Sequence, residues 1–522
     1  MHIAQSLAAL QLDAQSATPL FRQLYETIKQ SILAGKLAAG MQLPPTRELA
    51  LLCGVSRQTV LNAYSQLMAE GYLSGTVGRG TFVSASLPIP STQQAASAGR
   101  QATQPMRPLS ARGQRFTGRQ AQLPFHQGEL RAFRIGMPGL DVFPFDVWGR
   151  LEARRWRKPP HELGYGDPAG YRPLREGLAA YLRAARGVQC TADQIIITSG
   201  SQQAVYLIAA LLLAPGEQAW VEEPGYRGIN ASLHAAEAQV CPVGVDAEGM
   251  IVSHGMHAYP DARLVYVTPT HQLPLGVTMS LQRRLELLAW ASASKAWVIE
   301  DDYDSEYRYT GPPLASLQSL DKTGCVIYVG TLSKVLFPSL RLGYIVAPPA
   351  LAEAFAQGKA ILDRHAPLVP QAVLTDFILE GHFSRHIKRT REVYAERRSA
   401  LLQALQSQLA DRLNIGVTDT GLHLPVMFRQ PCDDEAVARK ALDHGLEIRA
   451  LSHFYNAREA DIPQPRACGM LLGFAAIPPE EIRRGVDALR VLLEGFQPGK
   501  AIGSKTAQPQ DRSHRLILSG IK

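Results

Sequence analysis

A lysine in a short polar loop follows directly on a hydrophobic run, and this feature constrains the fold more than any other. The run covers residues 326–329, and the loop after it, residues 330–334, reads Gly-Thr-Leu-Ser-Lys. Earlier in the chain, the hydrophobic run 297–299 is followed by the carboxylates of residues 300–302. Such runs alternate here with helical stretches, a pattern that predicts an α/β domain with a mostly parallel sheet. Ligands bind where the strands of such sheets end, so we expect the lysine and the carboxylates to share one site.

Two further segments offer groups that bind a phosphate. The small polar residues 198–203 precede an apolar helical stretch, residues 204–214, and helix N-termini of this kind bind phosphate. Arg341 adds a guanidinium that can bind a phosphate through two hydrogen bonds. Lys334 can form a Schiff base with an aldehyde, and Asp301 can keep a pyridine nitrogen protonated. Each element alone is weak evidence, but the four in this order predict a site for pyridoxal 5'-phosphate (PLP).

Residues 129–497 resemble the fold-type-I aminotransferases over essentially their whole length. The resemblance implies that Lys334 is the Schiff-base lysine and that Asp301 binds the pyridine nitrogen. It also implies that Tyr303 binds the phenolic oxygen of the ring and that Tyr226 stacks on the ring. Tyr165 is implied to reach the phosphate of a neighbouring subunit. The other phosphate contacts that the resemblance implies are Ser201, Gln202, Thr331, Ser333 and Arg341.

Two positions depart from the aminotransferase pattern. Leu273 replaces the Asn of the Asn-Pro-x-Gly string, so we expect His271 or Gln272 to help bind the phenolic oxygen instead. Leu471 stands where members that use amino acids carry an Arg for the substrate carboxylate, unless the alignment is shifted by a residue or two. Loss of such a buried anchor costs roughly 2–4 kcal/mol, which disfavours an ordinary α-amino-acid transaminase. Arg227 is a candidate ligand-binding residue that could anchor an anion from another wall.

Residues 1–84 form a second predicted unit, made of helical patterns that end in a Gly-rich hairpin. Apolar residues recur at helical spacing over residues 20–32, which places one helix face against a core. Gly54 separates two further helical stretches, and Ser56 is a candidate N-cap for the second, residues 57–70. A helix, a short turn and a second helix predict a helix-turn-helix, whose second helix enters the major groove of DNA.

This unit resembles the winged helix-turn-helix of the GntR family. The matching strings are residues 43–50, 54–60 and 78–82. Guanidinium groups bind phosphates and guanine edges, hydroxyl groups bind phosphates, and glycine allows close approach of the backbone. A helical protein-interaction module is the alternative for this unit. The DNA-binding residues that the resemblance implies are Arg47, Ser56, Arg57, Thr59, Gly78 and Arg79.

The remaining segments predict little regular structure. Residues 85–128 contain no Asp or Glu and no apolar repeat, which predicts a flexible linker, with contacts from its arginines to DNA as an alternative role. Residues 498–522 are expected to form a loose tail. The six cysteines form no C-x-x-C pair, so they indicate neither a zinc site nor a disulfide framework, and no metal site is predicted. The longest apolar run, residues 204–214, is too short to span a bilayer.

We call residues 1–84 the reader. The order of reader, linker and PLP domain is similar to that of the MocR/GabR regulators. This resemblance implies a cytoplasmic transcription regulator that binds a double-stranded DNA operator as a homodimer and senses an amine or PLP. Net catalysis is not expected, beyond a vestigial aminotransferase half-reaction. The alternative is an active aminotransferase with an ancillary DNA-binding domain, which Lys334 and Asp301 permit. A scaffold without PLP is disfavoured by the complete set of cofactor residues.

Overall fold

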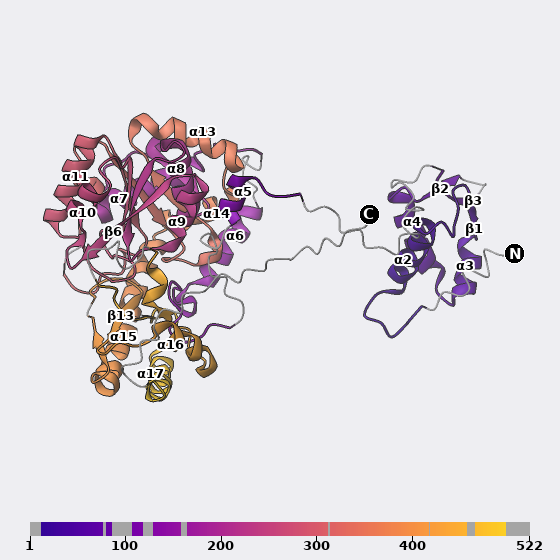
Figure 1. Cartoon of the computed structure of the whole chain (residues 1–522). Helices are drawn as coiled ribbons and strands as arrows, with labels where there is room; N and C mark the ends of the chain where they lie inside the picture. Colours follow the sequence, from indigo (N-terminus) through magenta and orange to yellow (C-terminus); the bar gives the residue numbers. More distant parts are fainter. Residues whose placement is uncertain are drawn as a thin grey trace, which may run out of the picture. The chain divides into compact units, whose positions relative to one another are not determined.

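The computed structural model describes most of the chain and divides it into two compact units. These units are Met1–Pro108 and Leu109–Lys522, so the division falls inside the predicted linker. Figure 1 shows both units, with labels on some of their helices and strands. Among the described residues, no helix combines the length and the apolar character needed to cross a membrane. The described ranges are 12–76, 80–85, 107–117, 129–157, 164–311, 314–416, 418–456 and 465–496.

In the described part of the smaller unit, three helices pack against a three-stranded antiparallel sheet of order β1-β3-β2. Leu24 and Ile28 of α2 and Val60 and Leu67 of α4 are completely buried, so the predicted apolar face of the first helix lies in a core. Gly54, with φ of 64°, ends α3 in the left-handed conformation. The predicted recognition helix ends one residue earlier than expected. The elements are α2 Leu20–Leu33, β1 Gln42–Leu43, α3 Thr46–Cys53, α4 Arg57–Ala69, β2 Leu73–Thr76 and β3 Gly80–Val83.

An eight-stranded sheet lies at the centre of the larger unit, with strand order β4-β11-β10-β9-β8-β5-β6-β7. The pairs β10–β9, β9–β8, β8–β5 and β5–β6 are parallel, and the pairs that involve β11 or β7 are antiparallel. The sheet is therefore mostly parallel, as the sequence predicts. Its strands are β4 Ile195–Thr198, β5 Gln218–Glu223, β6 Gln239–Asp246, β7 Gly249–Met250, β8 Leu264–Val267, β9 Trp297–Asp302, β10 Val326–Thr331 and β11 Gly343–Val346.

Helices cover both faces of this sheet (Figure 1). One apolar core joins the sheet to α8, α9 and α13. On the opposite face, one core joins β4, β10 and β11 to α6, α7 and α14, and another joins β5, β6, β8 and β9 to α10 and α11. Both faces are buried, which explains why the strands read as continuous apolar runs. The helices are α5 Ala111–Thr117, α6 Phe145–Arg157, α7 Arg172–Arg186, α8 Ser201–Leu212, α9 Arg227–Ala235, α10 Val252–Ala258, α11 Leu281–Ser294, α12 Leu317–Leu320, α13 Ala352–Asp363 and α14 Leu368–Leu379.

A second sheet, four-stranded and antiparallel with order β12-β13-β15-β14, belongs to the C-terminal part of the larger unit. The long helix α15 and the C-terminal helix α17 pack together, and their apolar side chains share a core with this sheet. We call this part the C-terminal subdomain. Its elements are α15 His382–Leu409, β12 Leu413–Ile415, β13 His423–Phe428, α16 Asp434–Ala441, β14 Arg449–Ala450, β15 Gly469–Gly473 and α17 Pro479–Glu494.

Helix α5 lies within the predicted linker and packs against α9. The guanidinium of Arg115 pairs with Glu237 just beyond α9, at 3.0 Å. The ring of Phe116 meets Tyr206 of α8 edge to face, with 6.0 Å between ring centroids. The sequence does not predict this helix, because the helix has no apolar repeat of its own. Contacts with the rest of the unit hold it in place.

Candidate functional site

Loops from five strands meet at one edge of the eight-stranded sheet. The registers of β8, β9 and β10 align their carboxyl ends, and Asp301 lies opposite Val329 across the β9–β10 pair. The loop after β10 carries Lys334, and the loop after β4 leads into α8. The segment after β5 leads into α9 in the same way. The structure therefore brings together groups that the sequence separates by more than a hundred residues.

Lys334 points from its loop toward the N-terminal end of the larger unit. Its Nζ donates a hydrogen bond to the carbonyl oxygen of Gly136 at 2.8 Å. A Cβ on Gly136 would lie only 2.8 Å from that nitrogen, so a larger residue there would displace the lysine side chain. Burial lowers the pKa of Lys334, and the nearby charges of Asp304 and Asp301 oppose this shift. Burial thus favours the neutral amine, which is the nucleophilic form.

Asp301 is buried with one carboxylate oxygen satisfied and the other free. The Tyr266 hydroxyl donates to Oδ2 at 2.6 Å, while Oδ1 has no hydrogen-bond partner among the described residues. Burial raises the pKa of Asp301 to about 7. A buried acceptor without a partner fits a ligand that brings its own N–H, such as a protonated pyridine nitrogen. The carboxylate therefore fits the position that PLP requires.

The groups predicted to bind the phosphate surround the N-terminus of α8. Gly200, with φ of 110°, is the N-cap of α8, and the Arg341 guanidinium lies 3.4 Å from where a Cβ at Gly200 would stand. Ser201 and Gln202 begin the helix, while Thr331 and Ser333 lie on either side of the β10 end. A helix N-terminus beside a guanidinium is a favourable setting for a phosphate.

Gln202 also ties α8 to α9. Its Nε2 donates to Gly228 O and to Ser232 Oγ, both at 2.6 Å, and its Oε1 is buried without a partner among the described residues. Tyr226 is the N-cap of α9, and its pKa is raised by burial and by the nearby charge of Asp301. The N-termini of α8 and α9 thus form one connected wall of the site.

Two predicted residues lie in open positions. Tyr165 is 83% exposed, and the Arg364 guanidinium lies 4.5 Å above its ring. Arg227 is exposed at the start of α9, and its Nη1 donates to the His453 carbonyl at 3.4 Å. The structure thus leaves both side chains accessible from outside the subunit.

Tyr303 is held by His271, and among the described residues its hydroxyl forms no hydrogen bond with Gln272. The Tyr303 hydroxyl donates to the His271 carbonyl at 2.8 Å and lies 3.1 Å from the His271 Nδ1. Gln272 turns away and donates to the carbonyl of Pro224 at 2.8 Å. Of the two candidates named for assisting Tyr303, only His271 is in contact with it.

The two departures from the aminotransferase pattern lie in one apolar cluster. Leu273 and Leu471 pack with Ile135, Leu275 and Phe454, and Leu471 is completely buried. The side chains at both positions therefore lie among hydrocarbon.

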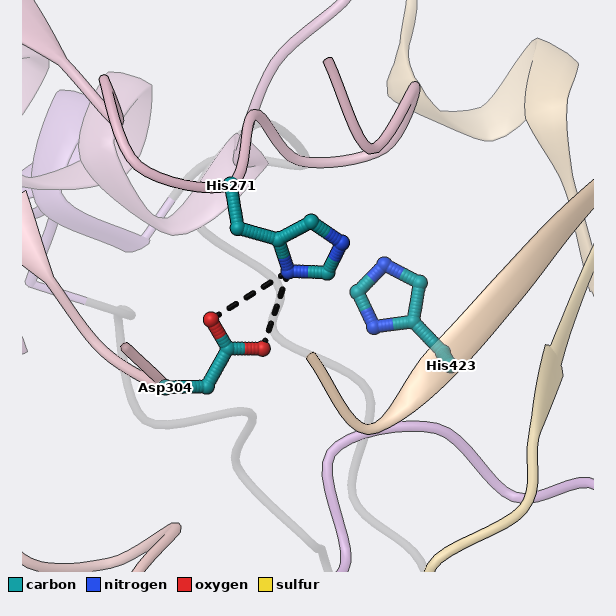
Figure 2. A group of neighbouring side chains, drawn as sticks. All are labelled: His271, Asp304 and His423. Atoms are coloured by element: carbon teal, nitrogen blue, oxygen red, sulfur yellow. Dashed lines mark hydrogen bonds and ion pairs between the residues drawn. The ribbon is translucent and has the colours of Figure 1, made fainter. Parts of the chain in front are cut away.

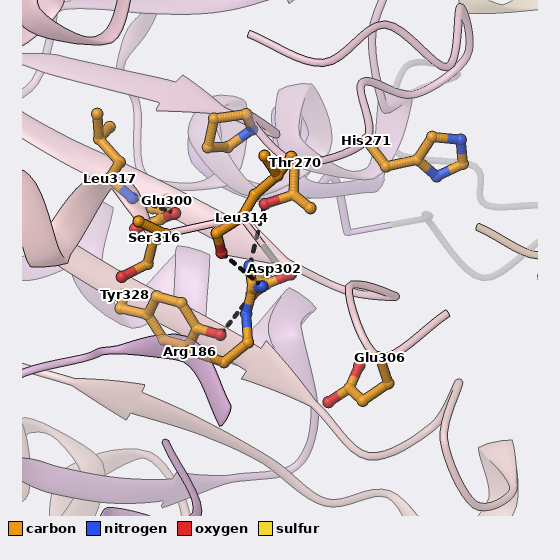
Figure 3. Close-up of polar contacts among 12 residues, drawn as sticks. Arg186, Thr270, His271, Glu300, Asp302, Glu306, Leu314, Ser316, Leu317 and Tyr328 are labelled. Atoms are coloured by element: carbon orange, nitrogen blue, oxygen red, sulfur yellow. Dashed lines mark hydrogen bonds and ion pairs between the residues drawn. The ribbon is translucent and has the colours of Figure 1, made fainter. Parts of the chain in front are cut away.

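A buried polar network supports the loops behind the site (Figure 3). Arg186 donates from Nε to Asp302 at 2.8 Å and from Nη2 to Thr270 Oγ1 at 3.1 Å, which links the ends of β9 and β8. The Tyr328 hydroxyl donates to the same Asp302 oxygen at 2.5 Å. This network fixes the loop that carries His271, and the sequence analysis did not identify it because Arg186 lies on a distant helix.

The predicted DNA-binding residues of the smaller unit lie on an exposed surface. Arg47 of α3 and Arg57 at the start of α4 are exposed and line one shallow depression. Ser56 is exposed, and its Oγ accepts the Thr59 backbone N–H at 3.1 Å, so it caps α4. The predicted wing residues Gly78 and Arg79 lie outside the described residues.

Comparisons with known families match both units. The model for aminotransferase class I and II matches residues 141–489, and the model for bacterial regulatory proteins of the gntR family matches residues 20–83. The probable rhizopine catabolism regulatory protein MocR of Rhizobium meliloti is 40% identical over 508 residues, which are 97% of this chain and 98% of that protein. The HTH-type pyridoxine biosynthesis transcriptional regulator PdxR of Corynebacterium glutamicum is 30% identical, over 90% of this chain and 95% of that protein.

Solved structures match the larger unit. A kynurenine aminotransferase of Pyrococcus horikoshii in complex with PMP gives a TM-score of 0.63 at 29% identity, over 70% of this chain and 91% of that one. The α-aminoadipate aminotransferase LysN of Thermus thermophilus gives a TM-score of 0.63 at 27% identity, over 70% of this chain and 92% of that one. The larger unit therefore has the fold of PLP-dependent aminotransferases.

Proposed function

Because the chain belongs to the MocR type of GntR-family transcription regulators, with PLP as its cofactor, we propose that its reader binds an operator as a homodimer and responds to an amine or to PLP. The observation that carries this proposal is the union of an exposed helix-turn-helix with a buried site that fits PLP. Each half occurs with other functions, but together they allow ligand binding to control DNA binding.

On the ligand side, the proposed roles follow from chemistry. Lys334 would hold the aldehyde carbon, Asp301 would keep the ring nitrogen protonated, and Tyr303 would bind the phenolic oxygen. Bound PLP supplies an electron sink that labilises bonds to a captured amine. Tyr226 would cover the ring, and the phosphate would bind Ser201, Gln202, Thr331, Ser333 and Arg341.

On the DNA side, Arg47, Ser56, Arg57 and Thr59, with the wing residues Gly78 and Arg79, are the proposed contacts. The exposure of Arg47 and Arg57 supports this assignment. Two readers in a homodimer would bind two half-sites. The exposed ring of Tyr165 supports the homodimer, because a tyrosine that reaches a neighbour's phosphate must leave its own subunit.

Helix α5 offers a route from the cofactor to the reader. It packs on α9 and touches Tyr206 of α8, and the N-termini of these two helices carry Tyr226 and Gln202 of the proposed cofactor site. A ligand shifts a conformational equilibrium only by its differential affinity for the two states. A ligand that moves α8 or α9 would change the contact that α5 makes and hence the point at which the linker leaves the larger unit.

The wall formed by Leu273 and Leu471 favours PLP itself, or an amine without an α-carboxylate, as the effector. Buried hydrocarbon does not compensate a carboxylate for its lost hydration. An acidic amine is the alternative effector, because the Arg227 guanidinium is exposed at the start of α9 and could bind its acidic group.

The experiment is to measure operator affinity for the wild type and for Lys334→Ala, without PLP, with PLP, and with PLP plus candidate amines. We expect PLP or an amine to change the wild-type affinity about 5- to 150-fold, the usual range of allosteric coupling. If PLP changes the operator affinity and no amine changes it further, PLP is the signal. No effect of any compound on the wild type would refute the sensor and favour an aminotransferase with an ancillary reader, which repeated turnover of amino-acid and keto-acid pools would establish.

A second variant tests the route through α5. Phe116→Ala should keep both PLP and operator binding and reduce the coupling between them, because it removes the contact with Tyr206. Gln114→Ala is the matched control, since the Gln114 side chain bonds to Leu109 within its own segment. Equal coupling in Phe116→Ala and the wild type would exclude this route.

A further inference from the structure

A buried group of two histidines and an aspartate lies where the two sheets of the larger unit meet. His271 follows β8, Asp304 follows β9, and His423 opens β13 of the C-terminal subdomain. Figure 2 shows the His423 ring facing His271, with Asp304 bonded to the near side of His271. The three residues are 1%, 1% and 3% exposed. Three distant segments thus place polar groups at one enclosed point.

The donor atoms are close enough to share a metal ion. One ligand atom from each residue can be chosen such that all lie within 4.8 Å of one another. Imidazole nitrogens and a carboxylate oxygen are donors that bind Zn²⁺ and Co²⁺ at about 2.0–2.2 Å, and three protein ligands are usual when a fourth position stays open. The side chains would have to draw closer together around the ion to reach these bond lengths.

Hydrogen bonding within the group is incomplete. The Nδ1 of His271 lies 3.0 and 3.2 Å from the two carboxylate oxygens of Asp304. The Nε2 atoms of His271 and His423, and the Oγ1 of Thr418, are buried without a hydrogen-bond partner among the described residues. Buried polar atoms in this state are rare and point to an ion or another bound group.

The surroundings leave little room for an organic ligand. A Cβ on Gly421 would lie 2.0 Å from Cε1 of His271 and 2.9 Å from Oδ2 of Asp304. Gly276 also approaches closely, since a Cβ there would lie 3.4 Å from His271 Nε2. The negative charge of Asp304 is buried, and a buried carboxylate is stabilised by a cation. A bare cation satisfies these constraints better than an amine does.

We infer that His271, Asp304 and His423 bind one divalent transition-metal ion of the zinc and cobalt class. The ion would join the loops after β8 and β9 to the C-terminal sheet, and would fix His271, the residue that holds Tyr303. This site goes beyond the proposed regulatory function. Sequence spacing does not predict it, because His423 lies far from the other two residues and no motif links them.

The test uses the full chain, treated with a chelator and freed of PLP, in the absence of DNA. Co²⁺ is added, and uptake is followed by its visible absorption and by metal analysis of the desalted protein. We expect one equivalent per chain with the strong absorption of a four-coordinate site, displaced by Zn²⁺. Absence of stoichiometric uptake would overturn the inference. Because neither DNA nor PLP is present, this result is independent of the regulatory proposal.

Two variants assign the ligands. Asp304→Asn keeps the shape of the side chain, and His423→Ala removes an imidazole; each should weaken Co²⁺ binding at least about 10-fold. His386→Ala is the matched control, since His386 is a buried histidine that also has a ring nitrogen without a partner among the described residues, but its other nitrogen bonds to the Val335 carbonyl at 2.9 Å. Circular dichroism checks folding. Wild-type affinity in a folded Asp304→Asn or His423→Ala would place the metal elsewhere.

Discussion

The reader and the ligand domain hold their functional side chains in opposite surroundings. In the reader, Arg47, Ser56 and Arg57 are exposed, and the core beneath them consists of aliphatic and tyrosine side chains. In the larger unit, which we call the ligand domain, burial raises the pKa of Asp301 and lowers that of Lys334. A change in the reader should therefore alter binding with little effect on folding, whereas a change in the ligand domain should alter both. The following predictions test this contrast.

The largest effect is expected for Lys334→Ala. Borohydride treatment of the wild type with PLP should attach the cofactor covalently to Lys334, and the variant should lose this attachment completely, because Lys334 follows β10 and its charge acts on Asp301. Mass spectrometry of the digested protein is the measurement. Lys322→Ala, which removes an exposed lysine, should label like the wild type. Labelling of the site in Lys334→Ala would reassign the lysine.

The next effect is the pH dependence of stability. Asp301 has a pKa of about 7 when folded, above its ordinary value of 3.8, so the folded state binds the extra proton between these values. The stability of the protein without PLP should therefore fall as pH rises from about 4 to 7, by at most about 1.4 kcal/mol per pH unit for this group. Asp301→Asn should remove that part of the slope in the calorimetric transition of the larger unit.

Other buried acids keep part of this slope in the variant. Glu222 and Glu300 also have pKa values raised by burial to about 7. The comparison is therefore between the variant and Asp261→Asn, which changes an exposed aspartate. Identical slopes in the two variants would contradict the assignment to Asp301.

A smaller effect is expected for Arg57→Ala in the reader. Its specific operator affinity should fall by about 1–3 kcal/mol, the worth of one good base contact, with unchanged thermal stability and unchanged PLP absorbance. Lys36→Ala removes the same charge from another exposed position and controls for general electrostatics. A loss of equal size in both variants would show that Arg57 contributes charge alone.

The smallest effect is expected for Ser56, where the contrast between the units weakens. Ser56 caps α4, so Ser56→Ala should destabilise the reader by about 1 kcal/mol, while Ser56→Gly should cost only a few tenths. Thermal unfolding measures the stability of each variant, and operator titration measures its DNA affinity. If both variants lose DNA affinity equally, the hydroxyl itself contacts DNA; if only Ser56→Ala does, it acts through the helix.

The sequence predicted those parts of the fold that local pattern determines. The apolar runs at residues 297–299 and 326–329 lie within β9 and β10, and the order of strands and helices predicted the mostly parallel sheet. The residues at the strand ends were also predictable, because parallel strands bring their carboxyl ends to one edge. Ser56 could be named as a cap because its position before a helical stretch is a local signal.

Features that depend on distant segments were not predictable. His423 joins His271 only because the C-terminal subdomain returns to the large sheet, and nothing beside it in the sequence marks this. Arg186 reaches Asp302 from a helix that precedes it by more than a hundred residues. Helix α5 is held by Tyr206 and Glu237, and no apolar repeat within its own sequence announces it.

The position of α5 has a consequence for protein engineering. A chimera that gives this ligand domain a new reader must be joined upstream of Arg107, although the sequence alone would place the joint anywhere up to residue 128. A joint at residue 129 would omit α5 and uncover the faces of Tyr206 and Glu237 that it contacts. Such a hybrid would retain the ligand domain and a reader but would lack α5, the helix proposed to connect them.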